Sequence, residues 1–359
     1  MILPESYSKE WIYSHRAKKG FEGINPPLAE KMIHALGLAE ALAASELDFI
    51  FKGGTSLILL ISTFDRFSID IDIITQAGRE QVERVLKEIC HGKPFIGFKL
   101  NERRSYQTGV PKAHYSLTYN SVIVGREDHI LLDILFDDNP YAVVLEVPIE
   151  TAWLKTDDKK VLIKIPSCES ITGDKLTAFA PNTTGIPYKK GKELDMVKQL
   201  NDVGKLYHEI KDMSVVIESF NRTVDKEIKY RGNICTRDNV IQDIIDTALL
   251  IAKREKNKEE PYKSNFAEIH LGLKQFRGYQ INSHFRIDEA ITASAKAALL
   301  ASKLKSNNIN KLELFSPDIR KDDCLFEEPA LNFLNKLQIE PLFYWSQAFK
   351  NLEDIGTFA

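Results

Sequence analysis

The sequence lacks the features that identify several common classes of protein. It contains no unbroken run of about 20 apolar residues, which a membrane-spanning helix requires. It has no excess of one charge, because 48 Lys and Arg stand against 51 Asp and Glu. With 43% hydrophobic residues, the composition also excludes a disordered or collagen-like chain. Sequence-independent coating of DNA is not expected either, although a local basic stripe that contacts an RNA end stays open.

Cysteine is scarce, and neither cysteine nor histidine shows the spacing of a metal site. There is no C-x-x-C pair, and the eight histidines show neither H-x-x-x-H nor H-E-x-x-H spacing, which disfavours zinc. The first residues, MILPESYSKEWIYSH, lack the basic start and apolar run of a signal peptide. We therefore expect a cytoplasmic protein with free thiols. The cysteines are Cys90, Cys168, Cys235 and Cys324.

Three common enzyme motifs are also missing. The sequence has no G-x-S-x-G, no Walker A loop and no G-x-G-x-x-G. Serine hydrolases, P-loop NTPases and dinucleotide-binding dehydrogenases therefore lose their usual sequence signatures.

The spacing of apolar residues predicts two regions of different character. Residues 28–45 repeat apolar side chains at helical intervals, and residues 68–75 alternate as a half-buried strand does. More strand-like runs follow through residue 165, after which the apolar period is helical. We therefore predict an α+β fold, with a mixed β-sheet and flanking helices in residues 1–211 and an all-α helical bundle in residues 212–359.

The sharpest local pattern is a pair of glycines between a predicted strand and a predicted helix. Gly53 and Gly54 let the backbone approach a ligand closely. The N–H groups of Thr55 and Ser56 then open the helix, where unpaired N–H groups can hold a phosphate. The pattern predicts a phosphate-binding turn.

Two aspartates follow on the next predicted strand. Side chains alternate along a strand, so Asp70 and Asp72 are expected on one face with their carboxylates together. Asp133, in the strand-like run HILLDILF, is a third candidate carboxylate of the same sheet. Mg²⁺ prefers one or two carboxylates together with phosphate oxygens and water, so we predict that these three residues bind Mg²⁺, with Mn²⁺ as the alternative ion.

Each of these patterns also has an ordinary structural interpretation. A lone D-x-D is more often a solvated strand face, and a lone GG is more often a plain turn. Their order favours the metal interpretation, because the alternating Ile69, Ile71 and Ile73 predict that the opposite face of the strand is buried. Like charges two residues apart on one strand also require a compensating cation or solvent.

The segment KGGTSLILLISTFDRFSIDIDI resembles the first motif of the AbiEii/AbiGii toxin family. Its members are nucleotidyltransferase-like proteins of the DNA polymerase beta superfamily, found in bacterial toxin–antitoxin and phage-defence systems. GDKLTAFA resembles that family's Lys-Leu-x-Ala helix and KQLNDVGKLY its later helix, so the resemblance covers about residues 30–210. It implies a nucleotidyltransferase-like fold, a phosphate contact for Lys175 and the acidic position of the later helix for Asp202.

The chain departs from the family pattern at three positions. Leu131 stands where members commonly carry a basic residue two before the third carboxylate. Lys198 and Gln199 stand where members carry an Arg-Asp pair before the later aspartate. These departures affect the second half of the predicted site, in particular the way in which the triphosphate is held.

The remaining candidates have open alternatives. Lys189 and Lys190, in the segment PNTTGIPYKKGK, either contact the nucleotide or are simply solvated. Asp202 either serves the site or stabilises its helix through Lys198 or Lys205, four and three residues away respectively. Ser68 either touches a phosphate or bonds to the backbone. A further residue, Arg66, is a candidate for a salt bridge beside the site.

The leading hypothesis is a Mg²⁺-dependent nucleotidyltransferase that uses an NTP. The family resemblance implies RNA, for example a tRNA end, or a protein hydroxyl as the acceptor, and a toxin whose partner is a cognate antitoxin. No membrane partner is expected. One alternative is an inactive nucleotide-binding or partner-binding module on the same fold, and a third possibility is a purely structural interaction protein.

Overall fold

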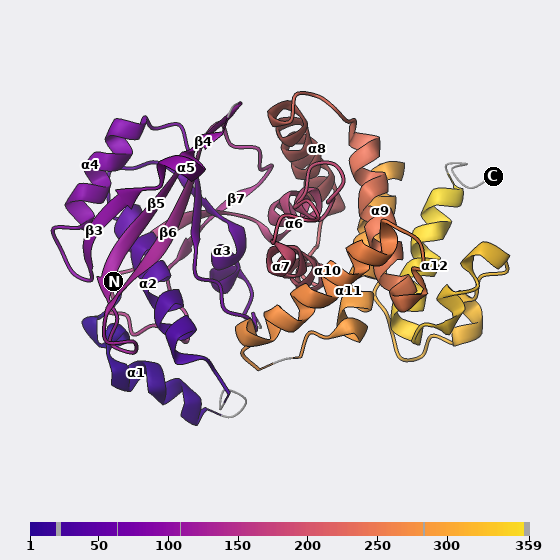
Figure 1. Cartoon of the computed structure of the whole chain (residues 1–359), viewed down its shortest axis with the longest axis horizontal. Helices are drawn as coiled ribbons and strands as arrows, with labels where there is room; N and C mark the ends of the chain where they lie inside the picture. Colours follow the sequence, from indigo (N-terminus) through magenta and orange to yellow (C-terminus); the bar gives the residue numbers. More distant parts are fainter. Residues whose placement is uncertain (19–22, 63, 108, 283, 355–359) are drawn as a thin grey trace. The chain divides into compact units, whose positions relative to one another are not determined.

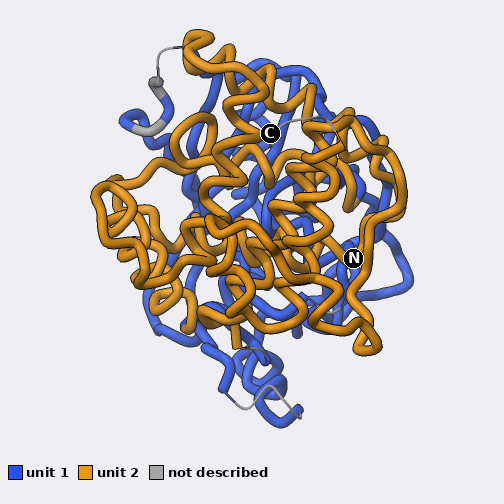
Figure 2. The backbone as a smooth tube through the Cα atoms, turned by 90° about the vertical axis from the view of Figure 1, so that its right-hand side faces the viewer, with its two compact units in different colours: residues 1–167, 278–283 blue, residues 168–277, 284–359 orange. Residues whose placement is uncertain are grey.

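The computed structural model describes residues 1–18, 23–62, 64–107, 109–282 and 284–354. The chain forms two compact units, which are coloured separately in Figure 2. Unit 1 consists of residues 1–167 and 278–283, and unit 2 consists of residues 168–277 and 284–359. Each unit has its own hydrophobic core.

Unit 1 is built on a mixed β-sheet with the strand order β1-β2-β6-β5-β3, and β4 pairs with the start of β5. β2 and β6 are parallel, and the other pairs are antiparallel. A separate antiparallel pair is formed by β7 and β8. The strands, labelled in Figure 1 where there is room, are β1 (Ile50–Lys52), β2 (Ile71–Thr75), β3 (Phe95–Leu100), β4 (Tyr106–Gln107), β5 (Val110–Asn120), β6 (Glu127–Phe136), β7 (Val144–Pro148) and β8 (Leu162–Pro166).

One face of this sheet is apolar and forms the core of unit 1. Ile71 and Ile73 on β2, and Leu132 on β6, are almost fully buried, whereas the residues between them are partly exposed. α2 packs on both strands and begins at Asn25, whose side chain accepts a hydrogen bond from the Leu28 N–H. The helices of unit 1 are α1 (Lys9–Ser14), α2 (Pro26–Ala43), α3 (Gly53–Leu60), α4 (Arg79–Ile89) and α5 (Glu102–Ser105), with short 3-10 turns η1 (Pro4–Tyr7) and η2 (His15–Ala17).

Unit 2 consists of helices joined by loops, with no β-strand among its described residues. The alanine-rich α11 packs against α7, α9 and α12, and α6 packs on α8 so closely that a Cβ at Gly173 would lie 2.5 Å from the Phe220 nitrogen. The helices are α6 (Cys168–Ala178), α7 (Glu193–Leu206), α8 (Met213–Tyr230), α9 (Arg237–Lys253), α10 (Tyr262–Phe276), α11 (Ile287–Ser306) and α12 (Ile339–Glu353). The 3-10 turns are η3 (Arg254–Lys256), η5 (Lys321–Cys324), η6 (Pro329–Leu331) and η7 (Leu334–Lys336), and η4 (Arg277–Tyr279) lies where the chain returns to unit 1.

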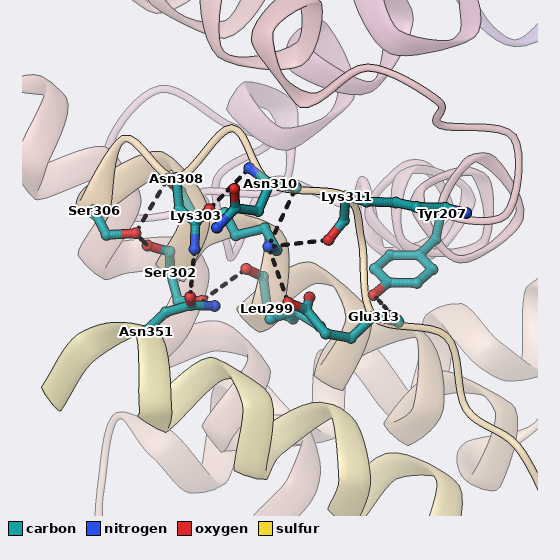
Figure 3. Close-up of polar contacts among 10 residues, drawn as sticks. All are labelled: Tyr207, Leu299, Ser302, Lys303, Ser306, Asn308, Asn310, Lys311, Glu313 and Asn351. Atoms are coloured by element: carbon teal, nitrogen blue, oxygen red, sulfur yellow. Dashed lines mark hydrogen bonds and ion pairs between the residues drawn. The ribbon is translucent and has the colours of Figure 1, made fainter. Parts of the chain in front are cut away.

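A buried lysine fixes the chain that follows α11. Lys303 is fully buried, and its ammonium lies 3.1 Å from Oε1 of Glu313 and within 3.5 Å of the carbonyl oxygens of Asn310 and Lys311. The Tyr207 hydroxyl donates to the Glu313 carbonyl at 2.7 Å. Figure 3 shows these side chains gathered around the segment of residues 310–313. A charge can remain in this core because a carboxylate and two carbonyls offset it.

The predicted α+β architecture is confirmed, with local differences. The acidic strand begins at Ile71, so Asp70 lies just outside it. After β5, residues 121–124 form a turn, because Glu30 accepts hydrogen bonds from the N–H groups of Val122 and Ile123. Within the region predicted as a helical bundle, residues 329–331 and 334–336 form only short 3-10 turns. The two units divide after Ser167, whereas the sequence predicted a boundary after residue 211, because α6 and α7 pack on α8, α10 and α11. Among the described residues, no helix is long and apolar enough to cross a membrane.

The buried imidazole of His34 on α2 predicts sensitivity to acid. Its Nδ1 lies 2.9 Å from the Glu30 carbonyl, and its ring stacks on Tyr119 with centroids 3.8 Å apart. Burial lowers the pKa of His34 from 6.5 to about 4, against smaller raising effects of the Glu30 carbonyl and Asp128. Because the folded pKa lies below the unfolded one, the stabilisation is present above pH 6.5 and is lost as the pH falls towards 4.

We expect His34→Phe to reduce this acid sensitivity. Between about pH 7.5 and about pH 4.5, the wild-type unfolding free energy should fall by about 2.5 kcal/mol more than that of the variant. Urea denaturation at both pH values measures the difference. His129→Phe is the control, since 55% of the His129 side chain is exposed. An equal loss in His34→Phe and wild type would contradict the assignment.

Candidate active site

Four ionisable residues form one row across the central strands of unit 1. The strand register pairs Lys52 on β1 with Asp72 on β2, Asp72 with Asp133 on β6, and Asp133 with His114 on β5. Directly paired residues point to the same side of a sheet, and neighbouring strands lie about 4.8 Å apart. The two carboxylates are therefore neighbours, with a basic side chain on the strand beyond each of them.

The contact at one end of the row is short. Nδ1 of His114 lies 2.5 Å from Oδ1 of Asp133, and the two side chains are 11% and 27% exposed. Sequence reasoning missed His114, since its partner lies on another strand and no spacing motif joins them. The only available signal was the alternation in AHYSLTY, which places His114 on the side of the strand opposite to Tyr115.

The start of α3 lies against the Asp72 carboxylate. Gly53 has φ +78°, and a Cβ at this position would overlap Oδ2 of Asp72. Only glycine combines this backbone conformation with so close an approach. The first N–H groups of a helix have no partner within the helix, so α3 presents its anion-binding end beside this carboxylate.

Hydroxyl groups hold the glycine turn in place. The Thr55 hydroxyl is fully buried, donates to the Asp70 carbonyl oxygen and lies 2.9 Å from Ser68 Oγ, and the Ser56 hydroxyl donates to the Gly53 carbonyl at 2.8 Å. These contacts tie the turn to the residues just before β2. The hydroxyls thus serve the structure of the turn, and its backbone N–H groups are the candidate phosphate donors.

A buried arginine lies beside the second glycine of the turn. Arg66 is 2% exposed, its Nη1 donates to the Phe67 carbonyl at 3.0 Å, and its guanidinium lies 5.0 Å from the centre of the Phe64 ring. A Cβ at Gly54 would overlap Nη2 of Arg66 and lie 2.9 Å from Ser68 Oγ. The glycine therefore brings the turn next to a cation, which strengthens its suitability for an anion.

The predicted residues of unit 1 lie close together in the structure. The glycine turn contacts Asp72 directly, reaches Asp70 and Ser68 through Thr55, and lies one strand away from Asp133. Among the described residues, however, no group of three or more His, Cys, Asp or Glu side chains has the arrangement of a metal site.

The residues present still provide ligands of the type that Mg²⁺ accepts. Asp72 and Asp133 are adjacent oxygen donors beside the glycine turn, and the remaining ligands of Mg²⁺ commonly come from phosphates and water. Mn²⁺ accepts the same donors.

Two predicted site residues of unit 2 bind each other. Nζ of Lys175 on α6 lies 2.8 Å from Oδ2 of Asp202 on α7, and the side chains are 7% and 0% exposed. Lys175 is therefore a buried residue and does not lie on the solvent-exposed face of α6. The partner of Asp202 seen here lies on another helix, whereas the sequence suggested Lys198 or Lys205. The pair joins α6 to α7 within unit 2.

The other predicted lysines of unit 2 lie on its surface. Lys189 and Lys190 are exposed, and the Lys189 N–H donates to Oε2 of Glu268 at 2.8 Å. Earlier in the same loop, Asn182 and Thr183 bind the buried Asp243. The loop is thus anchored to α9 and α10, and its lysine side chains are solvated.

We expect Gly53→Ala to be far more damaging than alanine at a matched glycine. Gly125, also in unit 1, has φ +74° with nothing within 4 Å of a Cβ, so Gly125→Ala should cost only the backbone penalty of about 1 kcal/mol. Gly53→Ala adds a clash with Asp72 and should cost a further ~1–3 kcal/mol. Urea denaturation measures both, and equal losses would show that the approach to Asp72 is not tight.

The buried ion pair of unit 2 can be tested in the same way. Lys175→Met leaves a fully buried carboxylate without its ammonium, which should lower the unfolding free energy by about 3–5 kcal/mol. The double variant Lys175→Met/Asp202→Leu should recover most of this loss. Lys189→Met, at an exposed position, is the control. A stable Lys175→Met protein with weakened NTP binding would instead support the phosphate contact that the family resemblance implies for Lys175.

Comparison with known protein families identifies the family of this chain. The model of the family described as "Nucleotidyl transferase AbiEii toxin, Type IV TA system" matches residues 37–292, more than half of the chain. The match includes the complete row across the sheet, the glycine turn and the Lys175–Asp202 pair. No curated protein matches the sequence.

Two solved structures resemble the chain distantly. JHP933 from Helicobacter pylori has a TM-score of 0.46 and 15% identity, and the match covers 79% of this chain and 96% of that one. An antigenic nucleotidyltransferase-like protein from Paracoccidioides brasiliensis has a TM-score of 0.37 and 13% identity, covering 57% and 90%. The assignment therefore depends on the family model: the chain belongs to the AbiEii family of nucleotidyl transferase toxins and combines a nucleotidyltransferase-like domain with a helical C-terminal region.

Proposed function

We propose that the protein is a Mg²⁺-dependent nucleotidyltransferase that transfers a nucleotide from an NTP to a hydroxyl acceptor. The observation that carries the proposal is the adjacent pair Asp72 and Asp133, with the start of α3 against Asp72. The start of a helix, which can bind a phosphate, lies beside two carboxylates that can bind a metal ion, and this combination supports a reaction at an α-phosphate.

In this proposal the backbone of the glycine turn binds the triphosphate. The N–H groups of Gly54, Thr55 and Ser56 would donate to the phosphate oxygens, and Arg66 supplies positive charge next to Gly54. The buried Thr55 hydroxyl, bonded to the Asp70 carbonyl, keeps the turn in register with the acidic strand. The turn would therefore bind the triphosphate without a large rearrangement of its backbone.

The acidic residues would carry the chemistry. Asp70, Asp72 and Asp133 would hold Mg²⁺ (or Mn²⁺), which when bound offsets the charge of the phosphate oxygens. The acceptor hydroxyl oxygen forms the new bond to the α-phosphorus, the bond to the pyrophosphate oxygen breaks, and pyrophosphate leaves with the electron pair. Asp133 would orient the hydroxyl and take its proton at a carboxylate oxygen.

The biological part of the proposal follows from the family. The family model is that of a toxin of a Type IV toxin–antitoxin system. We infer that this chain is the toxin of such a pair, acts in the cytoplasm, where NTPs are available, and is opposed by a cognate antitoxin. RNA, including tRNA, and protein hydroxyls are the candidate acceptors.

Label transfer from an NTP tests the proposal. Purified protein is incubated with Mg²⁺, each α-labelled NTP, and either total RNA or total protein. We expect Asp72→Asn and Asp133→Asn each to reduce transfer by about 100-fold or more, because each removes charge from the reacting centre. Glu127→Gln, at the exposed start of β6, is the matched control and should transfer normally.

The outcomes separate the candidate functions. Transfer that persists in both aspartate variants would refute the assigned site. Tight NTP binding without transfer to any acceptor would support the alternative, an inactive nucleotide-binding module. No binding of any NTP at millimolar concentration would favour a structural interaction protein.

A further inference from the structure

We propose that His114 is a positioning residue of this site, which fixes the carboxylate of Asp133 through a hydrogen bond from Nδ1. The inference depends on the proposed function, because it assigns a role towards the same reacting centre. It starts from the 2.5 Å contact between Nδ1 of His114 and Oδ1 of Asp133.

The direction of the contact follows from the sheet. β6 lies between β2 and β5, so His114 approaches Asp133 from the side opposite to Asp72. A carboxylate accepts hydrogen bonds at two oxygens. With Oδ1 bound to the imidazole from the β5 side, rotation of the carboxylate is restricted, and its second oxygen keeps a defined direction relative to Asp72.

The backbone of His114 is itself held on both sides. Its N–H donates to the Ser105 hydroxyl at 2.9 Å, and its carbonyl accepts from the Asn101 N–H at 2.7 Å. The Ser105 hydroxyl donates in turn to the Asn101 carbonyl at 2.7 Å, and Ser105 is 3% exposed. The short segment α5 thus closes on the strand at His114, so the imidazole projects from a fixed point.

The other buried histidines of unit 1 do not have this arrangement. His34 bonds to the backbone carbonyl of Glu30, and His15 bonds to those of Trp11 and Ala152. Such contacts satisfy a buried ring within the fold. His114 instead donates to a partly exposed carboxylate in the row, which is the arrangement that orients metal-binding and proton-accepting groups.

Two amide substitutions test the inference with matched chemistry. Asn places an N–H group near the position of Nδ1, whereas the longer Gln places it near the position of Nε2, away from Asp133. We expect His114→Gln and His114→Ala to lower kcat by about 10–100-fold, with the KM for NTP changed less than about threefold. His114→Asn should stay within about threefold of wild type, and the melting temperature of each variant reports on folding.

A second readout does not depend on turnover. Binding of Mn²⁺, followed by its electron paramagnetic resonance signal in the presence of a non-hydrolysable NTP analogue, should weaken by about 10-fold or more in His114→Gln and be restored in His114→Asn. A purely structural role would change the melting temperature without this difference between the two amides. Should His114→Ala fail to fold, the comparison of Asn with Gln still decides.

The failure of this inference differs from the failure of the proposed function. Transfer that is lost in Asp133→Asn but unchanged in folded His114→Gln would overturn the role of His114 and leave the proposed function standing. Equal impairment of His114→Asn and His114→Gln would also overturn it. A wild-type protein that neither transfers nucleotide nor binds Mn²⁺ with the analogue would overturn both.

Discussion

The parallel pairing of β2 with β6 is the constraint on which the candidate site depends. Its register sets Asp72 opposite Asp133, although the two residues are far apart in the sequence. A slip of one residue would turn Asp133 into the apolar face and expose Leu132, so burial of that face fixes the register. The same strand register therefore buries the apolar core residues and places the two carboxylates side by side.

Close approach of the backbone is the second requirement of the site. The turn at Gly53 and Gly54 lies so near to Asp72 and Arg66 that a methyl group at either glycine would collide with a charged side chain. The N–H groups that open α3, a carboxylate and a guanidinium are thereby brought next to one another. The negative charge of Asp72 and the positive charge of Arg66 can both lie beside this turn, because Asp72 is next to Gly53 and Arg66 is next to Gly54.

Much of this arrangement could be predicted from the sequence because the signals are local. The D-x-D with alternating isoleucines predicted an acidic strand with one buried face, and Ile71 and Ile73 are indeed buried. The GG followed by a hydroxyl pair predicted a turn that opens a helix, and α3 begins at Gly53. In each of these segments, the residues that set the local structure are those that carry the pattern.

The parts that sequence reasoning missed depend on contacts between distant segments. Nothing local distinguishes Lys175 from a surface lysine, because its partner Asp202 lies on the next helix. Lys303 likewise appears as one more lysine near the end of α11, and its burial depends on carbonyl groups that arrive after the chain has turned back. The division after Ser167 was missed for the same reason, since α6 joins the helical unit through its packing on α8.

The departure from the family pattern at Leu131 has a structural counterpart on the neighbouring strand. Leu131 and Asp133 are two residues apart on β6 and so share a face, but a leucine cannot donate a hydrogen bond to a carboxylate. His114, paired with Asp133 across β5, brings a nitrogen donor to that carboxylate from the other direction. His114 on β5 can therefore take the place of a basic residue at position 131 on β6. The register places His114 as near to Asp133 as the residues two positions away on β6 are. The absence of a basic residue at position 131 is therefore weak evidence that the site is inactive.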